Sequence, residues 1–216
     1  SISGQLVKSL GSGQDVEILV ENIKIYGESS AEKYPMQPKR HSFEFLRENA
    51  HLRVRTSTFG AIMRIRSKLS YAVHKFFQEE NFHYVNTPII TSNDAEGAGE
   101  MFRVTTLDPK SPPLEKDNVD FKKDFFSKKT HLTVSGQLEA ESYALGLGKV
   151  YTFGPTFRAE NSNTTRHLSE FWMIEPEMSF FNLEDNINLA ERFVKYILKS
   201  ILENCIDDLS FLEERL

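Results

Sequence analysis

The chain has 216 residues, of which 39% are hydrophobic and 26% are charged, and its formal net charge is −5. This composition is typical of a globular domain with a buried core, and the negative charge argues against indiscriminate binding to nucleic acid without excluding a local basic track. Cys205 is the only cysteine, which excludes an internal disulfide and a cysteine-rich zinc site. No apolar run approaches the roughly 20 residues of a membrane helix, and the first residues have no signal-peptide core, so we expect a cytoplasmic protein without a membrane partner.

The first 27 residues alternate apolar and polar side chains around glycine turns. Val16, Ile18 and Val20 share one face, which is typical of a β-strand. Two or three strands cannot cover a core alone, so we expect either the end of a larger β-domain or an edge hairpin of the main domain. Residues 28–56 are polar and turn-rich, and we interpret them as a linker.

A helix is predicted from Thr58 to Asn81, capped by Ser57 or Thr58, because apolar residues recur there at spacings of three and four. These residues are Ile62, Ile65, Leu69, Val73, Phe76 and Phe77. The strand FHYVNTPIIT follows at 82–91. Pro88 removes a hydrogen-bond donor from its middle, so we expect this strand to be bent or to lie at a sheet edge.

Two loops come next. The segment DAEGAGEMF places Asp94, Glu96 and Glu100 around two glycines, which predicts either a mobile acidic loop that approaches a ligand or an acidic surface turn. Residues 108–130 are rich in proline and lysine without a sustained period, and we expect an inserted loop. Its lysines are either solvated or contact phosphates; they are Lys122, Lys123, Lys128 and Lys129.

The segment HLTVSGQLEAESYALG reads as a strand that ends in Ser135-Gly136-Gln137 and leads into a helix. Gln137 could cap that helix or face a ligand. A second amphipathic helix is predicted from Leu183 to Leu202, with Asn182 as its cap.

The segment from Val150 to Met178 reads as two apolar strands joined by a polar loop, and it carries the candidate binding residues. They are Arg158, Glu160, Arg166, His167 and Phe171. An antiparallel pair brings both strand ends together, so these side chains can face one ligand. Arg158 offers a planar fork of donors to a phosphate, Phe171 a stacking face, and Glu160 an acceptor for an exocyclic amine. ATP fits that description. The alternative interpretation is an ordinary hairpin with a solvated charged loop, which binds no ligand.

The wording FRAENSNTTRHLSEFWMIEPE resembles motif 2 of class II aminoacyl-tRNA synthetases, in the asparaginyl version of the aspartyl, asparaginyl and lysyl subgroup. The helix and the Pro88 strand, residues 58–91, resemble motif 1, which forms the family's homodimer interface. A plain core helix explains the apolar stripe equally well, and the Pro88 strand favours motif 1. The segment GQLVKSLGSGQDVEILVENIKIYG resembles the end of the family's anticodon-binding OB-fold.

The resemblance implies an α/β (α+β) fold in which an antiparallel β-sheet core is flanked by helices, with the end of an N-terminal OB-fold β-barrel. The implied divisions are 1–27 for the OB-fold remnant, 28–56 for the linker and 57–216 for the catalytic domain. That domain is expected to be incomplete, because nothing between Asn182 and Leu216 resembles motif 3, and this piece alone is expected to be inactive.

The resemblance also implies residue roles. Arg158 would stabilise the α-phosphate in the transition state, Arg166 and His167 would hold the β- and γ-phosphates of ATP, and Phe171 would stack on adenine. Glu160 would lie near the adenine amino group or the tRNA acceptor end. The amino-acid pocket would be formed by Glu96, Ser135, Gln137 and Glu175. No metal ligand is assigned within the chain, since the main Mg²⁺ ligands are expected beyond Leu216.

Ala140 favours asparagine as the amino acid. Aspartate-specific relatives carry a lysine at this position, which pairs with the side-chain carboxylate of the substrate. Alanine cannot form this ion pair, so aspartate would lack its charged partner here. The implied function is ATP-dependent asparagine activation and transfer to the 3′ end of tRNA(Asn). The alternatives are an aspartyl-tRNA synthetase, an asparagine synthetase on the same core, or a module that binds without catalysis.

Overall fold

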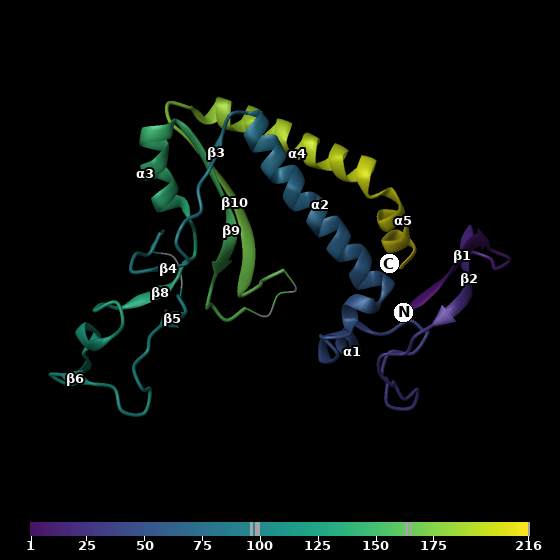
Figure 1. Ribbon diagram of the computed structural model, residues 1–216. Helices are drawn as coiled ribbons and strands as arrows, with labels where there is room; N and C mark the ends of the chain where they lie inside the picture. Colours follow the sequence, from purple (N-terminus) through teal and green to yellow (C-terminus); the bar gives the residue numbers. More distant parts are fainter. Residues whose placement is uncertain (96, 98–99, 163, 165, 216) are drawn as a thin grey trace. The chain divides into compact units, whose positions relative to one another are not determined.

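The computed structural model describes residues 1–95, 97, 100–162, 164 and 166–215 (Figure 1). The chain divides into two compact units, residues 1–60 and 61–216.

The first unit contains an antiparallel hairpin of β1 (Ile2–Lys8) and β2 (Val16–Ile23), which confirms that strands occupy the first 27 residues. A bulge follows Ser3, and a Cβ on Gly4 would lie 2.0 Å from the carbonyl oxygen of Leu19, so only glycine fits there. The apolar side chains of β2 are about half exposed. The assignment of this hairpin to an OB-fold stays a prediction.

The segment expected to be a linker also contains helical turns. They are α1 (Phe43–Glu48), capped by the Ser42 hydroxyl, and the 3-10 turn η1 (Arg53–Arg55).

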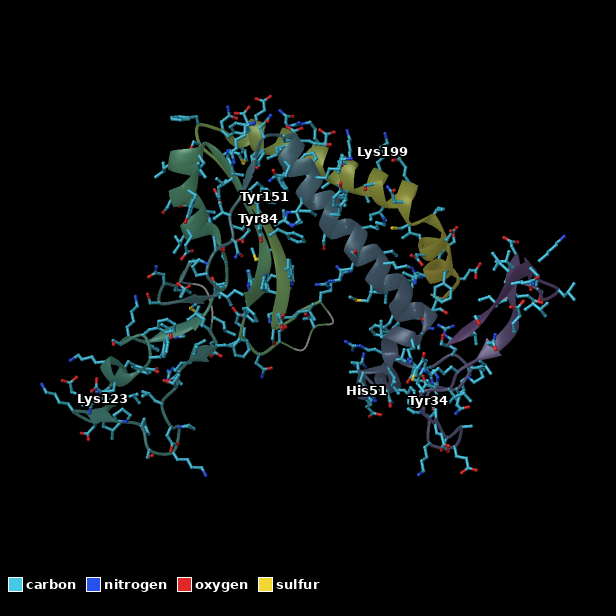
Figure 2. All side chains as sticks on the ribbon, in the orientation of Figure 1. Tyr34, His51, Tyr84, Lys123, Tyr151 and Lys199 are labelled. Atoms are coloured by element: carbon cyan, nitrogen blue, oxygen red, sulfur yellow. The ribbon has the colours of Figure 1, made fainter. Side chains whose placement is uncertain are left out.

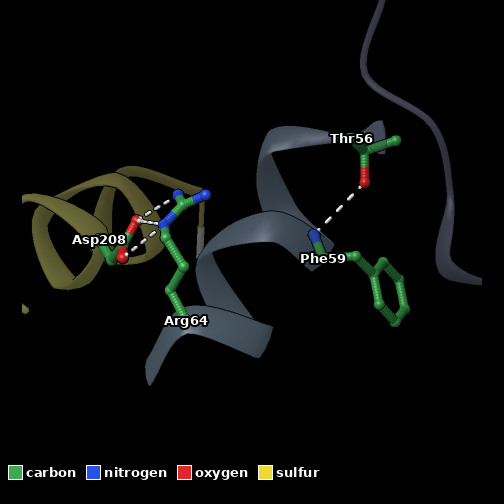
Figure 3. A network of polar contacts seen from close by, with 4 residues as sticks. All are labelled: Thr56, Phe59, Arg64 and Asp208. Atoms are coloured by element: carbon green, nitrogen blue, oxygen red, sulfur yellow. Dashed lines mark hydrogen bonds and ion pairs between the residues drawn. The ribbon is translucent and has the colours of Figure 1, made fainter. Parts of the chain in front are cut away.

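The long helix α2 (Ser57–Glu79) confirms the predicted helix, with slightly different ends. The Thr56 hydroxyl accepts the Phe59 amide at 3.3 Å and caps its N-terminus (Figure 3), so the expectation of Ser57 or Thr58 as the cap was wrong. Three adjacent hydroxyl residues made this choice ambiguous from the sequence.

The C-terminus of α2 is fixed by a left-handed residue. Asn81 has φ 62°, its amide donates to Gln78, and the Phe82 amide donates to the Phe77 carbonyl at 2.9 Å. This is the Schellman arrangement, and the rings of Phe77 and Phe82 pack with centroids 5.2 Å apart, as that motif favours.

The central sheet of the second unit has the order β10-β9-β3. The antiparallel pair of β9 (Lys149–Phe157) and β10 (Glu170–Met178) confirms the two strands predicted between Val150 and Met178. β3 (His83–Tyr84) runs parallel to β9 at the sheet edge.

The segment 82–91 bends as expected, but it is not one strand. β4 (Ile90–Thr91) belongs to a second sheet of order β4-β8-β5, with β5 at Arg103–Val104 and β8 at Thr130–Leu132. Pro88, which has no amide hydrogen for a ladder, lies between β3 and β4.

The insertion at 108–130 is more ordered than a loop. It contains a small hairpin of β6 (Leu114–Glu115) and β7 (Asn118–Val119), followed by the 3-10 turn η2 (Phe121–Lys123). The Lys122 ammonium lies 3.1 Å from the Glu115 carboxylate and that of Lys123 lies 3.9 Å from Asp120.

Helices cover both faces of the central sheet. α3 (Gln137–Leu147) packs through buried alanines against Val85 and Val150. On the other face, aromatic side chains of α2 and β9 form the main core with α4 (Leu183–Asn204). Figure 2 shows Tyr84 and Tyr151 beside each other in this region, with ring centroids 5.3 Å apart. Antiparallel sheets flanked by helices therefore match the predicted fold class.

The C-terminal helices are tied to this core. Asn182 and Asp185 form a capping box at the start of α4, which confirms the predicted cap. The last helix, α5 (Ile206–Arg215), contacts α2 through an ion pair: the Arg64 Nε donates to an Asp208 oxygen at 3.0 Å (Figure 3).

Candidate functional site

One face of the β9–β10 pair is open beyond the N-terminus of helix α3. Successive side chains of a strand point to opposite faces, so Thr152, Gly154 and Thr156 share one face with their partners Glu175, Met173 and Phe171. A Cβ built on Gly154 would meet no atom within 4 Å. A hollow lies over this face, and its lining includes Thr133, Gly136, Thr152, Gly154, Thr156 and Glu175.

Arg158 and Phe171 lie together at one end of this face, as the sequence predicts. The guanidinium carbon lies 5.3 Å from the ring centroid, and both residues are partly buried. The backbone fixes both residues: the Arg158 amide donates to Ser169, and the Thr156 hydroxyl donates to the Phe171 carbonyl at 3.2 Å. A fork of donors and a stacking face are therefore available within one site.

Glu160 and His167 approach each other across the loop between β9 and β10. The Glu160 Oε2 lies 3.9 Å from the His167 Nε2, and both atoms are buried without a hydrogen-bond partner among the residues that the structure describes. Buried polar atoms in native proteins normally have a partner, so this pair has unused capacity for a polar ligand or water. Arg166, in the same loop, is exposed.

The Glu175 carboxylate is held by three donors. It accepts hydrogen bonds from the Ser135 hydroxyl, from the Gly136 amide at 3.1 Å, and from the Thr152 hydroxyl at 2.8 Å. The sequence pointed to Ser135 and Glu175 but missed Thr152. Its position on the same strand face as Gly154 and Arg158 was the available signal.

Gln137 is the first residue of α3, and its side chain bonds Glu141. Its amide nitrogen Nε2 donates to Glu141 at 2.9 Å, while its backbone amide donates to the Ser135 hydroxyl at 3.0 Å. The structure therefore brings the backbone of Gln137, but not its side-chain amide, to the Ser135–Glu175 pair.

The same face carries further carboxylates. Burial first, and then the charges of Glu141 and Glu175, raise the pKa of Glu177 above its ordinary value. The part of this rise in the Glu177 pKa that comes from Glu141 and Glu175 indicates a locally negative environment, which favours a cationic group such as an ammonium.

The acidic loop expected to close over a ligand is described only in part. Glu96 lies outside the described residues. Glu100 connects the loop to the end of β9, since its carbonyl accepts the Ala159 amide at 2.8 Å. Asp94 and Glu100 also line a second hollow with Arg103, Lys129 and His131. Burial, followed by the charges of Lys129 and Arg103, lowers the pKa of His131.

The described part of the chain shows neither a membrane span nor a metal centre. None of its helices combines the length and the apolar character required to cross a bilayer. Across the described ranges, no three His, Cys, Asp or Glu residues form a group that could hold a metal ion.

Comparisons with known proteins identify the family to which the chain belongs. Asparagine–tRNA ligases from Cytophaga hutchinsonii and Borrelia garinii subsp. bavariensis are 61% and 60% identical to the chain, over 99% of its length and 46% of theirs. The chain thus spans about half the length of the curated relatives that it matches. The crystal structure of asparaginyl-tRNA synthetase from Pyrococcus horikoshii complexed with asparaginyl-adenylate superposes with a TM-score of 0.76 at 30% identity, covering 91% of this chain and 41% of that one. Residues 42–214 match the family of class II tRNA synthetases (D, K and N), and the chain belongs to that family.

Proposed function

We propose that the whole protein is an asparagine–tRNA ligase, which uses ATP to convert asparagine to asparaginyl-adenylate and then transfers the amino acid to the 3′ end of tRNA(Asn). One observation carries the proposal: the Arg158–Phe171 pair and the fixed Glu175 carboxylate lie on the same open face of the β9–β10 sheet. A nucleotide and an ammonium group can therefore bind side by side. The names of the curated relatives support the choice of substrate.

Arg158 has the central role in the activation step. The carboxylate oxygen of asparagine attacks the α-phosphorus of ATP and forms a new oxygen–phosphorus bond. The bond between the α-phosphorus and the bridging oxygen to the β-phosphate breaks, and pyrophosphate leaves. Negative charge builds on the non-bridging oxygens of the α-phosphate, and the Arg158 guanidinium is placed to stabilise it. No general base is needed, because the attacking carboxylate is already ionised.

The other candidates of the β9–β10 loop bind ATP. Phe171 offers its ring to adenine, and Glu160 accepts from the adenine amino group or contacts the tRNA acceptor end. Arg166 and His167 hold the β- and γ-phosphates. The unused hydrogen-bonding capacity of Glu160 and His167 supports this assignment.

The amino-acid end of the site is built around Glu175. Its carboxylate receives the ammonium of asparagine, with Glu96 closing over it and Gln137 contacting main-chain groups of the substrate. Because the Gln137 side chain bonds Glu141, this last contact requires the side chain to turn. Ser135 belongs to the same pocket through its bond to Glu175.

Ala140 supports asparagine over aspartate. This residue is 0% exposed and packs in the apolar cluster of Val85, Ala144 and Val150. The position therefore offers no charge to pair with the side-chain carboxylate of aspartate. An aspartyl-tRNA synthetase is the second candidate, and only the similarity of fold favours it.

The partners of the proposed enzyme follow from the family. We propose a cytoplasmic homodimer that pairs through residues 58–91, and ATP as the co-substrate. We propose that Mg²⁺ accompanies ATP as a cofactor; among the described residues, no group of three His, Cys, Asp or Glu side chains could hold this ion.

Pyrophosphate exchange tests the proposal. The full-length protein should exchange labelled pyrophosphate into ATP in the presence of asparagine and much less with aspartate. Comparable rates with both amino acids would contradict the asparagine assignment. Absence of exchange with any amino acid, together with tRNA binding, would favour a module that binds without catalysis.

A further inference from the structure

The Glu175 carboxylate lies at the centre of a cradle formed by three elements. The Ser135 hydroxyl and the Gly136 amide come from the turn before α3, and the Thr152 hydroxyl comes from β9. One carboxylate oxygen accepts from Ser135 and the other from Gly136 and Thr152. Both oxygens are therefore directed by the protein before any ligand arrives.

Thr152 is placed to act on Glu175 and not on a ligand. The two residues are directly opposite each other in the β9–β10 register, and Thr152 is 3% exposed. The hydroxyl has one hydrogen, which it donates to the Glu175 Oε2 at 2.8 Å. A hydroxyl that is buried and whose only hydrogen is used cannot also donate to a substrate.

The orientation of Glu175 needs such support. The last torsion of a glutamate side chain has a broad distribution, so the plane of its carboxylate is not fixed by rotamer preference. The carboxylate of Glu177 lies close enough for its charge to repel that of Glu175. Hydrogen bonds from neutral donors to an ionised carboxylate are strong enough to hold one orientation against that repulsion.

The turn before α3 is itself packed against Thr152. A Cβ on Gly136 would lie 2.7 Å from the Thr87 hydroxyl oxygen and 3.1 Å from the Thr152 Cγ2, so the glycine allows the turn to approach β9 closely. This approach lets the Gly136 amide and the Thr152 hydroxyl share one carboxylate oxygen.

We propose that Thr152 is a positioning residue for the amino-acid substrate, which acts by fixing the Glu175 carboxylate in the direction that receives the substrate ammonium. This inference rests on the proposed function. Under this proposal β9 contributes to amino-acid recognition through Thr152, while Arg158, directly after β9, contributes to ATP binding. Preorganisation of this kind lowers the ordering cost of binding and affects the ligand that contacts Glu175.

The test is a comparison of Thr152→Val with Thr152→Ser in the full-length protein, by pyrophosphate exchange at varied asparagine and varied ATP. Valine keeps the volume but removes the donor, whereas serine keeps the donor. We expect Thr152→Val to raise the KM for asparagine on the order of tenfold, the scale of one lost hydrogen bond to a charged group. We expect the KM for ATP to change less than about twofold by the same reasoning, and Thr152→Ser to restore most of the asparagine KM.

Thr130→Val is the matched control. Thr130 is also a buried threonine, at 4% exposure, but its hydroxyl donates to the Val104 carbonyl instead of a carboxylate. A change that merely loosens the fold should raise both KM values in either variant, and melting temperatures identify such a loss of stability.

The outcomes separate the two proposals. If the wild type does not exchange pyrophosphate with asparagine, the proposed function is wrong. If the wild type does so, but Thr152→Val leaves the asparagine KM unchanged or raises both KM values equally, Thr152 does not position Glu175. A Thr152→Ser variant as weak as Thr152→Val would overturn the inference in the same way, even if the valine variant folds poorly.

Discussion

The guanidinium of Arg158 lies over the ring of Phe171, with its central carbon 5.3 Å from the ring centroid. The contact is of the cation–π type and holds the donor fork at the edge of the open sheet face. It places the group that is proposed to neutralise the α-phosphate beside the group that is proposed to stack on adenine.

The first prediction concerns this arginine. Arg158→Ala should lower the rate of pyrophosphate exchange by roughly 100- to 1000-fold, the cost of one lost transition-state donor. Arg158→Lys keeps the positive charge but loses the planar fork and the stacked contact, so it should remain well below the wild type. A loss below about tenfold in the alanine variant would show that Arg158 does not contact the α-phosphate.

The second prediction uses two glycines that differ in their surroundings. Gly154→Ala places a methyl group on the open face, where it meets no protein atom within 4 Å. The fold should tolerate this change or gain slightly, because alanine loses less backbone entropy than glycine in a strand. The added methyl group should obstruct a ligand that binds against this face. We therefore expect higher KM values for asparagine or ATP with an unchanged or higher melting temperature.

Gly136→Ala is the matched control for that substitution. Its Cβ would lie 2.7 Å from the Thr87 hydroxyl oxygen, so either the Thr87 side chain or the turn before α3 must shift. Overpacking of this kind costs about 1–3 kcal/mol and lowers the melting temperature by several degrees. If Gly154→Ala has wild-type KM values, no ligand rests on the β9 face.

The long elements of this fold could be predicted from the sequence, because their signals are local. The apolar period of α2, the cap of α4 at Asn182 and the strands β9 and β10 all lie within single segments. Arg158 directly follows β9 and Phe171 lies near the start of β10, so the proximity of these two proposed ATP-binding residues followed from one hairpin.

The remaining features depend on contacts between distant segments. The separation of 82–91 into β3 and β4 is decided by their partners β9 and β8. The strands of the 108–130 insertion are two residues long and have no period to detect. Thr152 was missed because its role depends on the register that sets it opposite Glu175.

The third prediction concerns the pH dependence of the insertion. Hydrogen bonds from the Thr105 hydroxyl first, and then from Thr106 and Phe125, lower the pKa of Asp124 from an ordinary value near 3.8 to about 2. A lowered pKa in the folded state means that the charged carboxylate stabilises the fold. Its contribution is therefore complete above about pH 4 and is lost as the pH falls through about 2.

Hydrogen exchange checks this expectation. Protection of the Thr106 and Phe125 amides, both of which donate to Asp124, should fall as the pH drops from 5 to about 2 after correction for intrinsic exchange rates. Asp124→Asn should show weak protection already at pH 5, while Asp120→Asn makes the same charge change in the insertion and should behave as the wild type. Equal protection of these amides in both variants would show that the Asp124 carboxylate does not stabilise the insertion.

The last prediction concerns the proposed dimer. Met63 and Tyr71 lie eight residues apart on α2, which places them on the same helix face, and they are 50% and 68% exposed. Aromatic side chains that become buried at an interface often contribute 2 kcal/mol or more, so Tyr71→Glu should raise the dissociation constant of the full-length dimer by about 30-fold or more. Lys199→Ala serves as the control, since this lysine lies on α4, outside residues 58–91, and pairs with Glu203 at 3.8 Å within its own helix. Sedimentation at decreasing concentration measures the effect. A full-length protein that sediments as a monomer while retaining activity would show that residues 58–91 do not form a required interface, and an unchanged dissociation constant in Tyr71→Glu would place the interface elsewhere.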